Sequence, residues 1–448
     1  MRLVWIFVIT GIVGLGLLMI VTFSAIRLIF GGPPSVSPTP APTVPTSSPI
    51  VATTPNQSAV TSTNATNLFN QAKTEAEAKQ YDKAIADYTE AIRLKPDYAE
   101  AYSNRAFAYT LVGKFDQAIA DCNEAIRIKP DLAEAYKNRA NPHNQLKQYD
   151  DAIADCNEAL RLNPNYAEAY TNRASSYIDL KQYDKAVADC DEAIRLKPAL
   201  YQAYDIRADA YEYQGQFDKA LVDLNEVIRL QPNLADAFVD RGYVYLNLNQ
   251  FDASIADSTE AIRLNPNLAI AFNNRGYAHI NLQQYDAAIA DLTEAIRLNP
   301  NMAFAYSNRG EAYNSLKEYK SGIADCTEAI RLNPSLVNAY IQRSYAYLNV
   351  KEYDAGLADS TEAIRLDPNL AVGYNNRGFA YVCLKQYSAG IADYTEAIRL
   401  NPNFGLAYIN RSLAYQQVGE IQKSKADKAR GEQLQGITRP GTDRRTGR

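Results

Sequence analysis

Small, aromatic and proline residues recur along most of the chain at one fixed spacing, and this pattern predicts its helices. Proline occurs every 34 residues from Pro96 to Pro402, ten times in all. With that proline as position 32, ten units run without a gap over residues 65–404. Position 8 is Ala, Gly or Ser in every unit, as at Ala106 and Gly276. We therefore expect two helices per unit, which cross closely at the small residue and end at the proline.

The unit also carries a specific set of residues at defined positions. Repeat two has aromatic, small, aromatic, alanine, alanine and proline residues in this order: Tyr102, Ala106, Tyr109, Ala118, Ala125 and Pro130. This set resembles the tetratricopeptide repeat (TPR) family. The resemblance implies an all-α, right-handed α-solenoid of helix-turn-helix units, whose first helices line a concave surface. An eleventh, degenerate copy with a polar second helix, residues 405–434, is expected to cap the stack, and a basic disordered tail follows at 435–448.

The chain begins with an apolar segment of a different kind. From Leu3 to Ile26, 24 residues carry no charge, which is long enough for one helix to cross the hydrocarbon core of a membrane. We interpret residues 1–30 as an uncleaved anchor, because this run is longer than the apolar core of a cleaved signal peptide. Residues 31–64 hold eight of the twenty prolines and predict a disordered linker. A small excess of positive charge before the anchor favours an extracytoplasmic repeat domain.

The composition limits the kinds of partner and the kinds of catalytic or metal site that the protein can have. The formal charge is −5, from 46 Lys and Arg against 51 Asp and Glu, which argues against nucleic acid as a partner. Only His143 and His279 are available for a Ser/His/Asp triad or a histidine metal site. The five cysteines form no C-x-x-C pair, and four of them share position 24 of their repeats, so we interpret those four as core residues. We expect no catalytic residue, no metal and no cofactor.

Charged residues follow the same period. Each of the ten units has Asp at position 23, Glu at position 26 and Arg at position 29. Glu and Arg three residues apart support a single helix. An arginine at position 7, from Arg105 onward, could pair with the second helix of the preceding repeat, for example with Asp87. We interpret these columns as structural.

Repeat three departs from the pattern, because Asn141, Pro142 and His143 stand inside its predicted first helix. A proline there removes a backbone hydrogen bond and costs about 3 kcal/mol. We expect a kink or hinge at this point.

The predicted concave surface holds two rows of candidate binding residues. Position 6 is often Asn, whose side-chain amide can form hydrogen bonds with the backbone of an extended peptide. This row of asparagines resembles the asparagine ladder of the O-linked N-acetylglucosamine transferase superhelix. The alternative, that these amides satisfy local backbone groups, stays open. Positions 2 and 9 become apolar in the later repeats, which indicates a binding stripe, although packing between neighbouring helices is an alternative for part of it. The candidate peptide-binding residues are Asn104, Asn138, Asn172, Tyr243, Asn274, Tyr277, Phe304, Asn308, Tyr345, Asn376, Phe379 and Asn410.

These features favour a membrane-anchored scaffold or adaptor without catalytic activity. It would bind extended segments of partner proteins on its concave surface and contact the membrane through residues 3–26. Two alternatives stay open: a targeting subunit for a glycosyltransferase encoded on another chain, and an import or secretion receptor.

Overall fold

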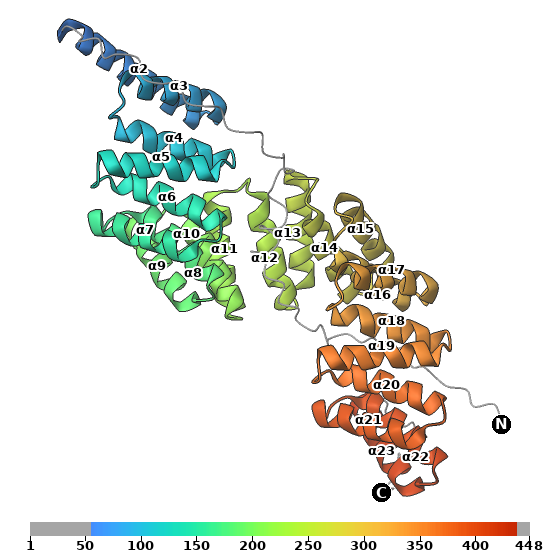
Figure 1. Cartoon of the computed structure of the whole chain (residues 1–448). Helices are drawn as coiled ribbons and strands as arrows, with labels where there is room; N and C mark the ends of the chain where they lie inside the picture. The colour runs from blue at the N-terminus through green and yellow to red at the C-terminus, as the bar shows by residue number, and fades with distance from the viewer. Residues whose placement is uncertain (1–54, 437–448) are drawn as a thin grey trace, which may run out of the picture. The chain divides into compact units, whose positions relative to one another are not determined.

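The computed structural model describes residues 55–436, which form 22 α-helices; no strand occurs in this range. The helices follow one another as pairs (Figure 1), which confirms the predicted all-α repeat. The described residues fall into two compact units, divided within α12 between Val244 and Tyr245. The first helices of the pairs are α2 (Pro55–Glu77), α4 (Ala99–Leu111), α6 (Ala133–Gln145), α8 (Ala167–Asp179), α10 (Tyr201–Tyr213), α12 (Ala235–Asn247), α14 (Ala269–Asn281), α16 (Ala303–Ser315), α18 (Val337–Asn349), α20 (Ala371–Cys383) and α22 (Gly405–Gln417). The second helices are α3 (Tyr81–Leu94), α5 (Phe115–Ile128), α7 (Tyr149–Leu162), α9 (Tyr183–Leu196), α11 (Phe217–Leu230), α13 (Phe251–Leu264), α15 (Tyr285–Leu298), α17 (Tyr319–Leu332), α19 (Tyr353–Leu366), α21 (Tyr387–Leu400) and α23 (Ile421–Leu434).

A left-handed backbone residue at position 15 ends each first helix. In repeat two this residue is Gly113, with φ of 76°, and the next residue donates its backbone N–H to the Tyr109 carbonyl at 2.9 Å. The same conformation occurs at Lys147 and Lys317 in other repeats. Because the carbonyls at the end of the first helix are satisfied in this way, the chain can reverse within a few residues.

Small side chains let the two helices of a pair cross closely. A Cβ atom added at Gly276 of α14 would lie only 2.7 Å from Cγ of Leu292 on α15. In repeat two the corresponding pair is Ala106 and Cys122, and both are fully buried. The prediction that the cysteines at position 24 are core residues is confirmed, since all four are free and buried: Cys122, Cys156, Cys190 and Cys326.

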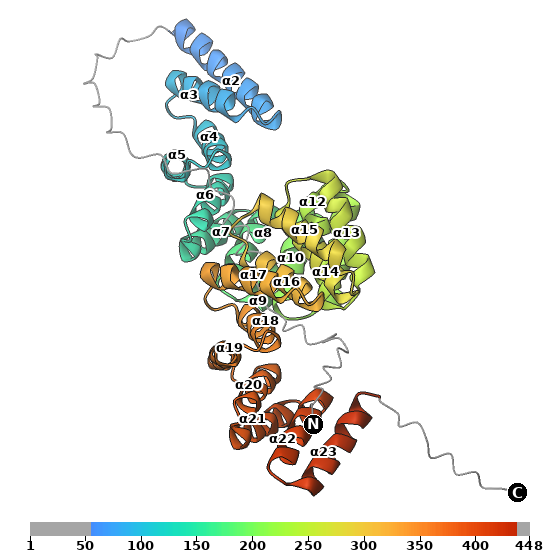
Figure 2. The ribbon, with the colours of Figure 1, turned by 90° about the vertical axis from the view of Figure 1, so that its right-hand side faces the viewer.

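Within each unit the helix pairs stack one on another (Figure 2). The stack is tighter on the side of the first helices. In residues 55–244, α4 packs against α6, α6 against α8 and α8 against α10, and in residues 245–436 the same contacts run from α14 to α22. The second helices of successive repeats have at most marginal contact with each other in either unit. Since elements on the inside of a bend lie closest together, the first helices line the inner side of each unit. We call this surface the first-helix face.

The structure tests only part of what the sequence predicts for the amino-terminal anchor and linker. The predicted anchor at residues 3–26 lies outside the described residues and stays a prediction. Within residues 55–436, no helix is both long and apolar enough to cross a membrane. The predicted linker is too long at its carboxyl end, because α2 already begins at Pro55 rather than at residue 65. Proline is well tolerated at the first position of a helix, where its missing N–H would have no partner.

Pro142 does not break its helix. Helix α6 has 13 residues, the same length as α4 and α8, and contains Pro142 in its interior. The ring is fully buried, and the Pro142 carbonyl still accepts a hydrogen bond from the Leu146 N–H at 3.0 Å. The helix therefore continues past the proline, although the Asn138 carbonyl, one turn back, has lost its usual backbone donor.

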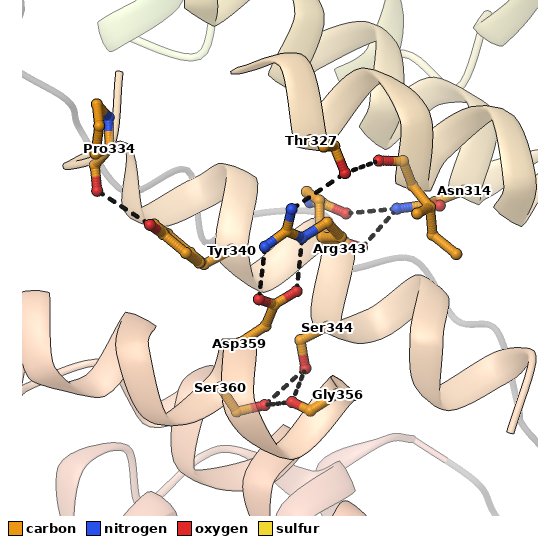
Figure 3. A network of polar contacts seen from close by, with 11 residues as sticks. Asn314, Thr327, Pro334, Tyr340, Arg343, Ser344, Gly356, Asp359 and Ser360 are labelled. Atoms are coloured by element: carbon orange, nitrogen blue, oxygen red, sulfur yellow. Dashed lines mark hydrogen bonds and ion pairs between the residues drawn. The ribbon is translucent and has the colours of Figure 1, made fainter. Parts of the chain in front are cut away.

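The arginines at position 7 pair with a different aspartate from the one expected. Arg105 donates two hydrogen bonds to Asp121 of its own repeat, at 2.7 and 2.8 Å, and a third to Thr89 of the preceding repeat at 2.9 Å. The expected pair with Asp87 is wrong. Figure 3 shows the same arrangement for Arg343, which holds Asp359 and reaches Thr327. Each of these guanidinium groups therefore joins the two helices of one repeat and also ties that repeat to the one before it.

Candidate peptide-binding face

Four of the candidate asparagines connect successive first helices. Each donates its side-chain amide to the residue at position 5 of the preceding repeat. Asn138 reaches both the carbonyl and the hydroxyl of Ser103 at 3.0 Å. The other three bonds are Asn172 to the Lys137 carbonyl at 3.4 Å, Asn308 to Asn273 Oδ1 at 3.1 Å, and Asn410 to Asn375 Oδ1 at 3.0 Å. These amides therefore stabilise the stack itself. Asn138 and Asn172 do so through backbone carbonyls, which is the alternative that the sequence left open, whereas Asn308 and Asn410 do so through side chains.

The three other candidate asparagines differ from this pattern. Asn104 forms a side-chain hydrogen bond with Tyr88 of the preceding repeat. Asn376 is buried and accepts a long hydrogen bond of 3.5 Å from Asn375 next to it in the chain. Asn274 is 3% exposed, and its Nδ2 has no hydrogen-bond partner among the described residues. Asn274 is thus a buried amide whose Nδ2 is unpaired and closed to solvent.

The aromatic candidates are all half-buried. Phe304 packs against the cluster of Ala303, Ala329, Leu336 and Ala339, and Phe379 packs against Val382, Tyr394 and Ala414. These two side chains therefore contribute to the core as well as to the surface. Tyr243 lies on α12 close to the division between the two units.

The two remaining tyrosines lie on α14 and α18. Tyr277 forms a side-chain hydrogen bond with Asn281, and burial raises the pKa of the Tyr277 hydroxyl. Tyr345 meets the ring of Tyr319 edge-on at 6.3 Å between centroids. Burial raises the pKa of Tyr345 to about 12. Both phenols therefore stay neutral donors at ordinary pH, on rings that are still partly open to a ligand.

The row of residues at position 9 also contains an acidic side chain, which is not among the candidate binding residues. Glu311, on α16, occupies position 9 between Tyr277 and Tyr345 in the neighbouring repeats. Its side chain accepts a long hydrogen bond of 3.4 Å from Asn338. A carboxylate within a column of aromatic residues was the signal in the sequence that could have identified it.

The acidic side chains of the other unit are arranged differently. Glu100 pairs with Lys129 at 2.8 Å and Glu168 pairs with Lys197 at 2.7 Å. Lys137, on α6, lies over the rings of Phe107 and Tyr166, at 5.5 and 5.8 Å from their centroids. Lysines of residues 55–244 thus supply cations to these two carboxylates and to these aromatic rings.

The histidines and the cysteines form no metal centre in the part of the chain that the structure describes, where no group of three or more His, Cys, Asp or Glu is suitably placed. His143 and His279 each lie 3.7 Å from the aspartate that the arginine of the same repeat holds, Asp155 and Asp291. They belong to the structural ion-pair columns.

The geometry defines a helical-repeat protein in which first helices line the inner face of each unit. Family models described as "Tetratricopeptide repeat" match residues 99–132, 133–166, 167–200, 235–268, 269–302, 303–336, 337–370 and 371–404. A further model described as "TPR repeat" matches residues 72–113 and 208–249. The chain belongs to the tetratricopeptide repeat family. All of these matching models describe the repeat itself.

The solved structures that the chain resembles are distant from it in sequence. Yeast Tom70 is 19% identical over 83% of this chain and 92% of its own, with a TM-score of 0.38. The Cut9-Hcn1 hetero-tetramer of the APC/C is 13% identical over 85% of this chain and 95% of its own, with a TM-score of 0.45. YrrB, described as a TPR protein with an unusual peptide-binding site, is 22% identical over 44% of this chain and 97% of its own, with a TM-score of 0.36. A search of curated proteins finds no match.

Proposed function

We propose that this protein is a membrane-anchored, non-catalytic adaptor that binds extended segments of partner proteins on the first-helix face of residues 245–436. The observation that carries the proposal is the row of half-buried aromatic side chains at position 9 of the first helices, Tyr277 on α14, Tyr345 on α18 and Phe379 on α20, each of which is still partly exposed. These rings would supply apolar contact area to a bound segment.

The binding part can be tested by selecting a random peptide library against the full chain in detergent. We expect the selection to recover peptides that bind in solution, and Tyr277→Ala to weaken that binding about tenfold, or about 1.4 kcal/mol. Asp354→Ala, at an exposed position of α19, is the control and should leave binding unchanged. Failure to recover any peptide, or equal loss in both variants, would contradict the proposal.

The anchoring part rests on the uncharged run at residues 3–26. We expect the full chain to stay in the membrane pellet after alkaline carbonate extraction, because a spanning helix is not removed by high pH. A chain that lacks residues 1–30 should be released into the supernatant. Release of the full chain as well would exclude an anchor.

A further inference from the structure

Glu311 lies on the first-helix face without a cation to balance its charge. It is half-buried, and none of the ion pairs formed within residues 55–436 includes it. Its hydrogen-bond donor is the Asn338 amide at 3.4 Å, which also lies 3.3 Å from the hydroxyl of Ser307. An amide shared between two acceptors at these distances stabilises a carboxylate weakly. Burial raises the pKa of Glu311, which is the effect expected when a carboxylate loses water and gains no cation.

The other unit shows two ways in which a lysine reaches this face. Lys129 and Lys197, both at position 31 of their repeats, pair with Glu100 and Glu168 at position 2. At position 9, which is the position of Glu311, the other unit has Phe107, and Lys137 at position 5 of the following repeat lies over its ring. The residue at position 5 of the repeat that follows Glu311 is Ile341, so the position that supplies a cation in the other unit is apolar here.

An aromatic side chain lies in the same row as Glu311. Tyr277 occupies the same position of the preceding repeat, on α14, which packs against α16. A carboxylate beside an aromatic ring attracts an ammonium or guanidinium group through both the ion pair and the ring quadrupole.

We propose that Glu311 and Tyr277 form a subsite for a lysine or arginine side chain of the bound protein segment. The subsite rests on the proposed peptide-binding function and adds the chemical class of its ligand. The cation supplies the charge that no residue of this part of the chain supplies.

The experiment compares three proteins in the same peptide selection: the wild type, Glu311→Gln and Glu100→Gln, each as the full chain in detergent. Glutamine keeps the size of the side chain and removes its charge. Glu100 serves as the matched control because its charge is already balanced by Lys129. We expect lysine and arginine to be enriched among peptides recovered by the wild type and by Glu100→Gln, and not among those recovered by Glu311→Gln. A recovered peptide should also lose about tenfold in affinity for the wild type when glutamine replaces its lysine, with no loss for Glu311→Gln.

The outcomes separate this inference from the function on which it rests. Recovery of peptides without basic enrichment overturns the cation subsite and leaves the peptide-binding function in place. Equal basic enrichment with Glu311→Gln overturns the assignment to Glu311, and loss of the enrichment with Glu100→Gln moves the site to the other unit. Recovery of no peptide by any of the three proteins contradicts both proposals.

Discussion

Arg343 and Asp359 form a two-pronged ion pair that closes repeat nine. Nε and Nη2 of Arg343 each donate to one carboxylate oxygen of Asp359 at 2.8 Å, and Nη1 donates to the hydroxyl of Thr327 in the preceding repeat at 3.1 Å (Figure 3). The side chains are only 16% and 9% exposed. Because the guanidinium is planar and rigid, Arg343 fixes both the two helices of its own repeat and the position of that repeat against the preceding one.

The first prediction concerns this buried pair. Arg343→Ala should lower the free energy of unfolding by about 3 kcal/mol, because it leaves Asp359 buried without its partner. Arg365→Ala removes a two-pronged pair of similar length with Glu362, but Arg365 is exposed, so its loss should leave stability unchanged. Urea unfolding followed by circular dichroism measures both. Equal destabilisation by the two variants would show that burial does not decide the strength of these pairs.

The second prediction separates two asparagines of the same column. Asn138→Ala should cost about 1–2 kcal/mol of stability, because its amide joins two repeats through Ser103. Asn274→Ala should cost less, since its Nδ2 has no partner to lose. Thermal unfolding of both variants provides the comparison. An equal loss of stability in Asn274→Ala would show that the hydrogen bond to Ser103 does not set the cost at this position.

The repeat period was readable from the sequence because it follows from packing. A small residue at Ala106 and a proline at Pro130 are required wherever two helices cross and the second must end. The periodicity does not show whether a long side chain bonds within its own repeat or to a neighbouring repeat. Asp87 and Asp121 occupy the same column one repeat apart, so Arg105 had two candidate partners, and only the structure shows that it bonds to Asp121.

The candidate site was harder to predict for a similar reason. An amide such as that of Asn308 can donate either to a ligand or to a neighbouring helix, and the sequence of the column is the same in both cases. Glu311 was missed although its place in a column of aromatic residues is visible in the sequence, because a single acidic residue at a surface position is ordinary. That it lacks a cation follows only from the positions of the lysines and arginines around it, and none of those within residues 55–436 pairs with it.

The third prediction is that Pro142→Ala raises the free energy of unfolding by about 1–2 kcal/mol. The buried slot at position 10 holds a fully buried alanine in other repeats, as at Ala108 and Ala312, so alanine fits it. The change restores a backbone N–H for the Asn138 carbonyl, and this gain outweighs the apolar packing that the proline ring provides. Thermal unfolding and hydrogen exchange over residues 133–145 measure the gain. Pro130→Ala, outside any helix, is the control, and unchanged or lower stability of Pro142→Ala would mean that the neighbouring repeats are adapted to the proline.

The last prediction uses pH to test whether Glu311 lacks a cation. Because its pKa is raised in the folded protein by burial, the folded state binds more protons than the unfolded state above the unfolded value of about 4.3. Stability therefore falls as the pH rises from there through the raised pKa. Glu311→Gln removes this fall, so at about pH 7 the variant should melt at a higher temperature than the wild type, and at about pH 3.5 the two should coincide.

Glu100→Gln should behave in the opposite way. The hydrogen bond from Lys129 lowers the pKa of Glu100, so this pair stabilises the folded state above about pH 4.3 and the contribution is lost as the pH falls through the lowered value. The variant should therefore melt below the wild type at about pH 7 and converge with it in acid. If Glu311→Gln also melted below the wild type at neutral pH, a cation within the protein would already hold the Glu311 carboxylate. The room for a ligand's lysine or arginine would then be gone.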